Sequence, residues 1–316
     1  MTGEAVAVSG LVKRYKETVA IDGLSFKIAQ GEIFGLLGPN GSGKTTTINC
    51  ILQLLSYDKG TINIFGKPMS ATAYDLKRRI GIVPQEVAVF NELSVRENID
   101  AFCALYVADK NQRRELVDEA IAFVGLEKFS KFRPKKLSGG LVRRLNIACG
   151  IAHKPDLIIM DEPTVAVDPQ SRNAILDGIE RLNAQGATII YTSHYMEEVE
   201  QLCHRIMIMD RGHEIASGTA EELKALVGLG EHISVEVRDG IDEALLEALR
   251  CLPHVRTVSY TSGRLLVDCT AGAHNLTDVI SCLAERKIAY GGLSSEPPTL
   301  NDVFLEITGR ALRDEV

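Results

Sequence analysis

Residues 31–52 read GEIFGLLGPNGSGKTTTINCIL, in which a glycine-rich segment separates two apolar runs. The apolar run Ile33 to Leu37 predicts a short buried strand, and an apolar helix is predicted over Thr46 to Leu55. Between them, Gly38 to Thr45 match G-x-x-x-x-G-K-[ST] in full. A strand, a glycine-rich loop and a helix in this order predict a loop whose backbone N–H groups close around phosphates.

The loop also supplies groups that suit a nucleoside triphosphate. Lys44 would reach the β- and γ-phosphates, and the Thr45 hydroxyl would hold Mg²⁺. The other residues of the phosphate cradle are Gly38, Pro39, Asn40, Gly41, Ser42, Gly43 and Thr46. The plain alternative is a glycine-rich turn with an incidental lysine, but the complete motif in its strand–helix context favours an ATP site.

An acidic pair follows a second apolar run, in PDLIIMDEPT at 155–164. The run Leu157 to Met160 predicts a strand buried on both faces of a parallel sheet. Asp161 at its end is placed to serve Mg²⁺, directly or through a water. Glu162 comes next, where its carboxylate could polarise a water aimed at the γ-phosphorus. A surface turn would also use Asp and Glu, but beside an intact phosphate loop the pair predicts a metal ligand and a general base.

Two adjacent glycines stand in LSGGL at 137–141, ahead of a predicted helix near Leu141. Inside a helix each glycine costs about 1 kcal/mol relative to alanine. Just before a helix, Ser138, Gly139 and Gly140 would instead leave backbone N–H groups bare for an anion.

With these motifs in order, the chain resembles the nucleotide-binding subunit of an ATP-binding-cassette (ABC) transporter over about residues 4–225. The resemblance identifies LSGGL as the family signature. It implies that Tyr15 stacks on adenine, that Gln85 in IGIVPQE links the Mg²⁺ site to a membrane partner, and that His194 in TSHYMEE contacts the γ-phosphate. It also implies that Asp168 crosses the seam of a head-to-tail dimer.

In this family the signature of one chain covers the ATP of the other, which gives the dry, preorganised site that hydrolysis benefits from. The resemblance therefore implies a second cassette chain, as a homodimer, in which Ser138, Gly139 and Gly140 act on the partner's nucleotide. Two positions depart from the common pattern: Leu141 replaces the usual glutamine, and TVAVD at 164–168 replaces TSGLD, with Ala166 in place of glycine.

Each single residue also has a plain structural interpretation. Tyr15 could be an edge-strand aromatic, and Gln85 could be a solvated residue after a proline. Ser138 to Gly140 could be a turn and helix cap. His194 could be a satisfied structural histidine, and Asp168 could open an Asp-Pro turn.

The chain of 316 residues has room for two domains. We expect an α/β nucleotide-binding domain over 1–226, with the fold of a P-loop NTPase cassette built on a mixed sheet. A helical subdomain is expected at about 86–150, and within it Ser94 to Glu97 predict a capping box. Residues 227–316 alternate as strand, helix, hairpin, helix and strand, which predicts a small ferredoxin-like α+β domain. We expect it to regulate the protein or support the dimer, and its three histidines lack ligand spacing.

Composition and patterning limit the kinds of ligand and cellular environment that the sequence predicts. The net charge of −7 argues against nucleic acid as the main ligand. The sequence has no apolar run long enough to cross a bilayer and no signal-peptide pattern. The seven scattered cysteines predict reduced thiols. The basic stretch at 128–136 is best explained as a solvated loop.

The stretch PPTLNDVFLEITGR at 297–310 resembles the C-terminal ending of drug- and antibiotic-exporter ATPases of the ABC-2 type. The resemblance therefore implies an ATP-hydrolysing export subunit, peripheral at the cytoplasmic face of the cell membrane, where it contacts the membrane through a separate multi-spanning permease. ATP and Mg²⁺ are the expected ligands, and the cargo class would be a drug, an antibiotic or a lipid-like molecule. One alternative is a soluble ABC ATPase of translation or DNA repair, although the second cassette and the long coiled coils of those types are missing. Another is a nucleotide-gated regulator without useful turnover, suggested by Leu141.

Overall fold

The computed structural model describes residues 3–193, 195–238 and 240–309. The chain divides into two compact units, one formed by the residues up to Thr219 and the other beginning at Ala220. The sequence placed the boundary after Leu226. Helix α8 (Ala220–Leu226) belongs to the second unit because it packs there against α11 (Leu300–Thr308), with Leu223 buried.

The first unit is built on a six-stranded sheet with the order β10-β9-β3-β8-β7-β6. All neighbours are parallel except β10 and β9. The strands are β3 (Ile33–Leu37), β6 (Ile80–Val83), β7 (Leu157–Asp161), β8 (Thr188–Thr192), β9 (Arg205–Asp210) and β10 (His213–Gly218). The two predicted strands, β3 and β7, are confirmed, because continuous apolar runs suit strands covered on both faces.

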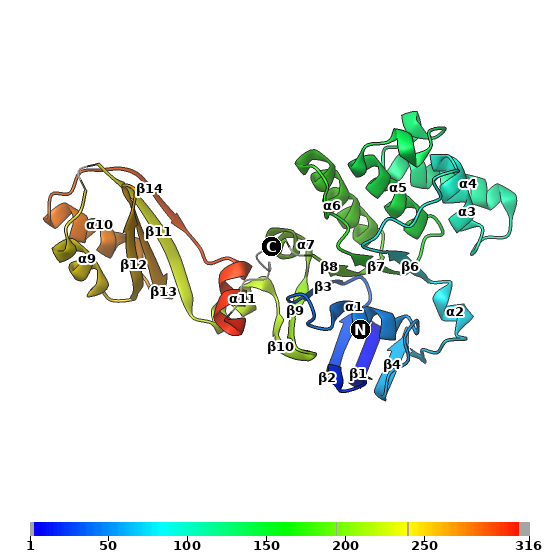
Figure 1. Cartoon of the computed structure of the whole chain (residues 1–316), viewed down its shortest axis with the longest axis horizontal. Helices are drawn as coiled ribbons and strands as arrows, with labels where there is room; N and C mark the ends of the chain where they lie inside the picture. Colours follow the sequence, from blue (N-terminus) through cyan, green and yellow to red (C-terminus); the bar gives the residue numbers. More distant parts are fainter. Residues whose placement is uncertain (1–2, 194, 239, 310–316) are drawn as a thin grey trace. The chain divides into compact units, whose positions relative to one another are not determined.

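A second, antiparallel sheet has the order β2-β1-β4-β5. Its strands are β1 (Glu4–Tyr15), β2 (Thr18–Ala29), β4 (Lys59–Ile64) and β5 (Lys67–Pro68). Helix α1 (Lys44–Ile51) shares one apolar core with both sheets (Figure 1). It begins two residues before the predicted start because Gly43, at φ 105°, ends the loop directly before Lys44.

A helical segment in the middle of the first unit has its own apolar core. It contains α3 (Val95–Cys103), α4 (Lys110–Phe123) and α5 (Gly139–Ile151), with 3₁₀ turns at Glu127–Phe129 and Pro134–Lys136. The predicted capping box is confirmed: Ser94 Oγ accepts from the Glu97 N–H at 3.3 Å, and the Glu97 carboxylate accepts from the Ser94 N–H at 2.7 Å.

Three further helices complete the first unit: α2 (Tyr74–Lys77), α6 (Pro169–Ala184) and α7 (Met196–Leu202). Helix α6 packs against α5 and α7. Across the described residues, no helix combines the length and the apolar character needed to span a membrane.

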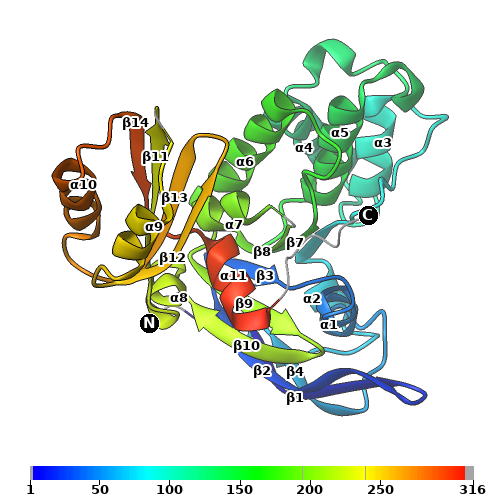
Figure 2. The same cartoon turned by 60° about the vertical axis from the view of Figure 1, so that its left-hand side comes forward.

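The second unit has the βαββαβ order that the sequence predicts, flanked by α8 and α11. Its sheet order is β12-β13-β11-β14, and all neighbours are antiparallel. The elements are β11 (Leu229–Val237), α9 (Glu243–Arg250), β12 (Val255–Thr261), β13 (Arg264–Thr270), α10 (Asn275–Glu285) and β14 (Tyr290–Glu296). Helices α9 and α10 cover one face of this sheet (Figure 2), and their apolar side chains form its core.

Candidate functional site

Four neighbouring parallel strands end at one edge of the six-stranded sheet. β3 runs into the phosphate loop, β6 runs into Pro84 and Gln85, β7 ends on Asp161, and β8 ends on Thr192. Asp161 and Thr192 face each other in the sheet register. Carboxyl ends of parallel strands are where open α/β sheets bind ligands. The fold thus brings together predicted residues that lie far apart in the sequence.

The phosphate loop is packed so closely that two of its glycines have no room for a side chain. A Cβ at Gly38 would lie 2.3 Å from the Met209 carbonyl oxygen, and one at Gly43 would lie 2.7 Å from the Ala20 carbonyl oxygen. Within the described residues, the Ser42 hydroxyl is buried and has no hydrogen-bond partner. A buried unsatisfied hydroxyl is costly, and a phosphate oxygen bound in the loop would satisfy it.

The lysine of the loop is held inside it. Lys44 is 7 % exposed, and its ammonium donates to the carbonyl oxygens of Gly38 at 2.6 Å and Pro39 at 3.1 Å. Thr45 follows it in the first turn of α1, with its side chain exposed, and Thr46 is half-buried. The loop therefore places an ammonium, a hydroxyl and a helix N-terminus together, a set that suits a Mg²⁺–triphosphate.

The acidic pair is fixed by the neighbouring strand. Thr192 Oγ1 donates to Asp161 Oδ1 at 2.6 Å and accepts from the Glu162 N–H at 3.0 Å. Glu162 is 5 % exposed, and Gln85 Nε2 donates to its Oε2 at 3.0 Å. The φ of Glu162 is 48°, which costs a residue other than glycine about 1–3 kcal/mol. Such strain is typical of positions that function has fixed.

The two signature glycines differ in their surroundings. A Cβ at Gly139 would meet no atom within 4 Å, whereas a Cβ at Gly140 would lie 2.5 Å from Ser171 Oγ and 3.0 Å from Asp168 Oδ2. Ser138 caps α5, and its Oγ accepts from the Leu141 N–H at 3.4 Å. Gly140 therefore allows α5 to approach α6, while Gly139 leaves open space at the helix N-terminus.

Asp168 caps α6 by accepting from the Ser171 N–H at 2.9 Å. The hydrogen bonds from Ser171 lower the pKa of Asp168, and the charge of Arg144 adds to this. Two residues earlier, Ala166 has a φ of 58°, in the left-handed region where the family's glycine would be unstrained. Ser138 therefore has the capping role of its plain interpretation, and this leaves the Ser138 hydroxyl proton available for another acceptor. Asp168, for which the plain interpretation was an Asp-Pro turn, caps the helix that begins at Pro169.

Two predicted residues are less tied to the site. Tyr15 lies at the end of β1 with 46 % exposure, and the Lys13 ammonium is 5.2 Å from its ring centroid. The exposed ring is available for stacking, and because β1 lies between β2 and β4, Tyr15 is not on an edge strand. His194 lies outside the described residues.

Sequence reasoning missed Glu198, a buried acid on α7. Its Oε2 accepts from the hydroxyls of Thr164 at 2.8 Å, Tyr191 at 2.7 Å and Ser193 at 2.7 Å. Burial, and then the charge of Glu198, raise the pKa of Tyr191. Glu198 thus ties the segment after the acidic pair to the end of β8. The only sequence signal was a Glu between the apolar residues Met196 and Val199 of a short helix.

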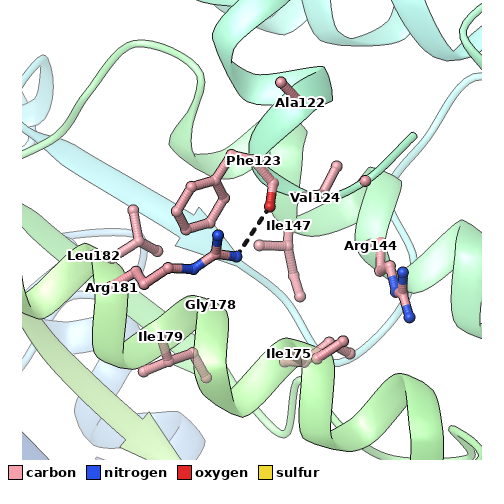
Figure 3. A pocket seen from close by; sticks show the side chains of 12 residues that line it. Ala122, Phe123, Val124, Arg144, Ile147, Ile175, Gly178, Ile179, Arg181 and Leu182 are labelled. Carbon is pink, nitrogen blue, oxygen red and sulfur yellow. Dashed lines mark hydrogen bonds between the residues drawn. The ribbon is translucent and has the colours of Figure 1, made fainter. Parts of the chain in front are cut away.

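A pocket of about 260 Å³ lies between α4, α5 and α6 (Figure 3). Apolar side chains such as Ile147 and Ile175 line it, and Arg181 at one side donates to the Phe123 carbonyl oxygen at 3.2 Å. Its lining includes none of the predicted nucleotide residues, so this pocket is separate from the phosphate loop.

Known proteins resemble this chain along nearly all of its length. The ABC transporter family matches residues 21–165. The linearmycin resistance ATP-binding protein LnrL of Bacillus subtilis (strain 168) is 44% identical over 305 residues, which cover 96% of this chain and 97% of that protein. The daunorubicin resistance ATP-binding protein DrrA3 of Streptomyces coeruleorubidus is 36% identical over 310 residues, which cover 98% of this chain and 97% of that protein.

Solved structures that resemble this chain come from the same family as these relatives. A dimeric ATP-binding cassette in a post-hydrolysis state, bound to ADP and phosphate, has a TM-score of 0.62 and 26% identity, covering 68% of this chain and 98% of that chain. An ATP-binding subunit of an ABC transporter gives a TM-score of 0.65 at 26% identity, covering 71% of this chain and 93% of that chain. With its phosphate loop, acidic pair and signature on one cassette fold, the chain belongs to the ABC transporter family as one of its ATP-binding proteins.

Proposed function

We propose that this chain hydrolyses ATP to ADP and phosphate and thereby drives export through a separate membrane permease. The observation that carries the proposal is the meeting of Lys44, Gln85 and the acidic pair at one edge of a parallel sheet. ATP is the substrate, and the groups that would act on it are supplied by β3, β6 and β7 and the loops after them.

The phosphate loop is proposed to hold the triphosphate. Backbone N–H groups from Gly38 to Thr46 would surround the phosphates, and the Ser42 hydroxyl would gain the partner that it lacks among the described residues. Lys44 would exchange its two carbonyl acceptors for phosphate oxygens. Tyr15 is proposed to stack on adenine, since its ring is exposed at the end of β1.

Three oxygen donors are proposed to hold Mg²⁺: the Thr45 hydroxyl, the Gln85 side chain and Asp161. Hydroxyl, amide and carboxylate oxygens are the ligands that this ion prefers. When bound, Mg²⁺ would neutralise charge on the phosphates. Thr192 fixes one Asp161 oxygen, so the carboxylate is oriented before the ion binds.

Glu162 is proposed to be the general base. Its buried carboxylate and strained backbone hold it at the edge of the sheet, where it would orient a water towards the γ-phosphorus and accept its proton. Gln85 contacts it directly and so links the base to the segment that follows β6. His194 is proposed, by family resemblance alone, to contact the γ-phosphate.

A second copy of the chain is proposed to complete the site. The N-terminus of α5, with Ser138 and Gly139, would face the ATP held by the partner, because the space beside Gly139 is open. Gly140 would serve the same helix end mainly by letting it pack on α6. Asp168 is proposed to lie at the seam of this dimer while it caps α6.

Transport is inferred from the relatives. The similarity to resistance ATP-binding proteins favours a drug- or antibiotic-type cargo. A chain of this kind would act as a peripheral subunit at the cytoplasmic face of the cell membrane, bound to a multi-spanning permease. No role for nucleic acid is proposed. The second unit is proposed to regulate the protein or support the dimer.

The proposal is tested by co-purification. A tagged Glu162→Gln protein, which should bind ATP and hydrolyse it very slowly, is extracted from native membranes in mild detergent with ATP and Mg²⁺. A stoichiometric multi-spanning protein is the expected companion. Ribosomes, repair factors or no companion at all would contradict the transporter assignment, and steady-state phosphate release by the wild-type complex separates an ATPase from a regulator that only binds ATP.

A further inference from the structure

One buried arginine has no role in the function proposed so far. Arg143 lies on α5, one turn after the signature, and is only 3 % exposed. The adjacent Arg144 is half-buried at the pocket of Figure 3. A fully buried guanidinium is rare and costly unless its donors are satisfied.

The donors of Arg143 reach two loops, one after β6 and one after β7, that meet at the sheet edge. Nη1 donates to the carbonyl oxygens of Pro84 at 3.0 Å and Gln85 at 2.7 Å. Nη2 donates to those of Asp161 at 3.3 Å and Glu162 at 2.5 Å. Nε donates to that of Pro163 at 2.7 Å.

The planar guanidinium of Arg143 holds the two loops at a fixed distance from each other. A guanidinium has five N–H donors in fixed directions, and five backbone carbonyls accept from them here. Two of these carbonyls belong to Gln85 and Glu162, whose side chains touch each other at 3.0 Å. Arg143 therefore fixes the distance between the backbones that carry the proposed base and its amide partner.

The same helix makes a second connection to the segment after β6. Asn146, one turn further along α5 and also buried, accepts from the Ala88 N–H at 3.0 Å and donates to the Pro84 carbonyl oxygen at 3.3 Å. Helix α5 packs against β6 (Figure 1). A displacement of α5 must therefore move residues 84–88, and through Arg143 it must also pull on residues 161–163.

We propose that Arg143 is a positioning residue that couples the signature helix to the hydrolytic groups of the same chain. The inference rests on the proposed ATPase function and dimer, and deepens them. The N-terminus of α5 would contact the partner's ATP, while Arg143, on the next turn, holds this chain's own Gln85 and Glu162. Occupation of one nucleotide site would thus set the geometry of the other, and hydrolysis at the two sites would be cooperative.

The test compares Arg143→Gln, Arg143→Lys and a matched control, Arg113→Gln. Arg113 lies on α4, its side chain is 15% exposed, and it binds Asp100 at 2.7 Å and the Val107 carbonyl oxygen at 3.2 Å. It shares the residue type and the partly buried hydrogen bonds, but it contacts no segment of the nucleotide site. General destabilisation of the helical segment would therefore appear in the control as well, and thermal unfolding of each variant shows how much loss of stability accompanies any loss of rate.

Four measurements on the full chain are expected to separate Arg143 from the control. ATP affinity changes by less than about threefold, whereas single-turnover hydrolysis falls about 10- to 100-fold in both Arg143 variants, because small misplacements of reacting groups have large effects on rate. The Hill coefficient for ATP also falls towards one. Amide exchange without nucleotide speeds up at 84–88 and 161–165 together, but not at 38–43.

Two other results overturn the inference. If Arg143→Lys hydrolyses ATP at the wild-type rate, the positive charge at this position supports hydrolysis and the five hydrogen bonds of arginine do not. A loss of rate equal to that of Arg113→Gln means a structural role only. If the wild-type chain binds ATP without hydrolysing it, the ATPase proposal fails, and the exchange measurement still decides whether Arg143 holds the two segments together.

Discussion

The two units of the chain place their polar side chains differently. In the first unit, buried polar residues gather at the carboxyl edge of the sheet; among them are Ser42, Lys44, Glu162 and Thr192. In the described part of the second unit, Asn275 is the one polar residue of the buried set, and the core under β11 to β14 is apolar. Burying polar groups costs free energy unless they are paired. The buried polar groups at the sheet edge are therefore expected to lower the unfolding free energy of the first unit, in return for their proposed role in ATP binding and hydrolysis.

The difference predicts what substitutions do in each unit. Changes at the edge of the first sheet should alter chemistry with modest effects on folding. Changes in the core of the second unit should alter folding and leave the nucleotide site intact.

The largest effect on stability is expected for Leu265→Ala on β13. Leu265 is fully buried, so truncation should lower the unfolding free energy by about 2–5 kcal/mol. The neighbouring Leu266 is 43% exposed, and Leu266→Ala is the matched control, with an expected change within about 0.5 kcal/mol. Urea unfolding followed by amide exchange in β11 to β14 measures both. Equal effects of the two leucines, or a change in ATP affinity, would contradict the comparison.

The second effect separates the two signature glycines. Gly140→Ala forces a Cβ against Ser171 and Asp168 and should lower stability by about 1–3 kcal/mol. Gly139→Ala meets open space, so it should leave stability unchanged or raise it slightly, yet weaken ATP-dependent dimerisation. Thermal unfolding and light scattering with ATP measure the pair. Two variants that behave alike would show that the distinction between packing and ligand contact is wrong.

A smaller effect is expected from pH on the second unit. Burial acts to lower the pKa of His232, but Asp268 at 2.8 Å and Asp302 at 3.2 Å outweigh burial and raise it. A raised folded-state pKa contributes stability that is complete below the unfolded-state pKa of about 6.5 and is lost as pH rises through the folded-state value. The melting temperature of the second unit should fall by at most a few degrees across this window, and His232→Gln should remove the slope. A slope that survives the substitution would exclude His232 as its source.

The smallest effect is expected for Ala166→Gly. Ala166 holds a left-handed conformation that costs an alanine about 1–2 kcal/mol, and glycine removes this cost while making the unfolded chain more flexible. The net gain should be about 0.5 kcal/mol. Equilibrium unfolding of the first unit measures it, and a clear loss of stability would mean that the methyl group of Ala166 has an important contact.

Much of the cassette could be predicted because its signals are local. The strands β3 and β7 are continuous apolar runs, the phosphate loop is one contiguous motif, and the cap at Ser94 needs only four residues. The βαββαβ order of the second unit followed from alternating periodicities.

What could not be predicted depends on contacts between distant segments. The five acceptors of Arg143 come from two loops separated by a whole helical segment, so the sequence offered only an arginine in a helix. The role of Gly140 depends on how closely α6 approaches, and the strain at Glu162 has no sequence signal. The place of α8 was missed because its partner α11 lies near the other end of the unit.

Glu162, at the carboxyl edge of the sheet, is proposed to be the base for ATP hydrolysis. Single-turnover hydrolysis by Glu162→Gln in the complex with its permease tests it most directly, beside a measurement of ATP affinity. The rate of Glu162→Gln should be at least about 100-fold below wild type, because a positioned base contributes about 10²–10⁴, and ATP affinity should be nearly unchanged. A rate within about threefold of wild type would contradict the assignment of Glu162 and with it the chemistry proposed for this edge.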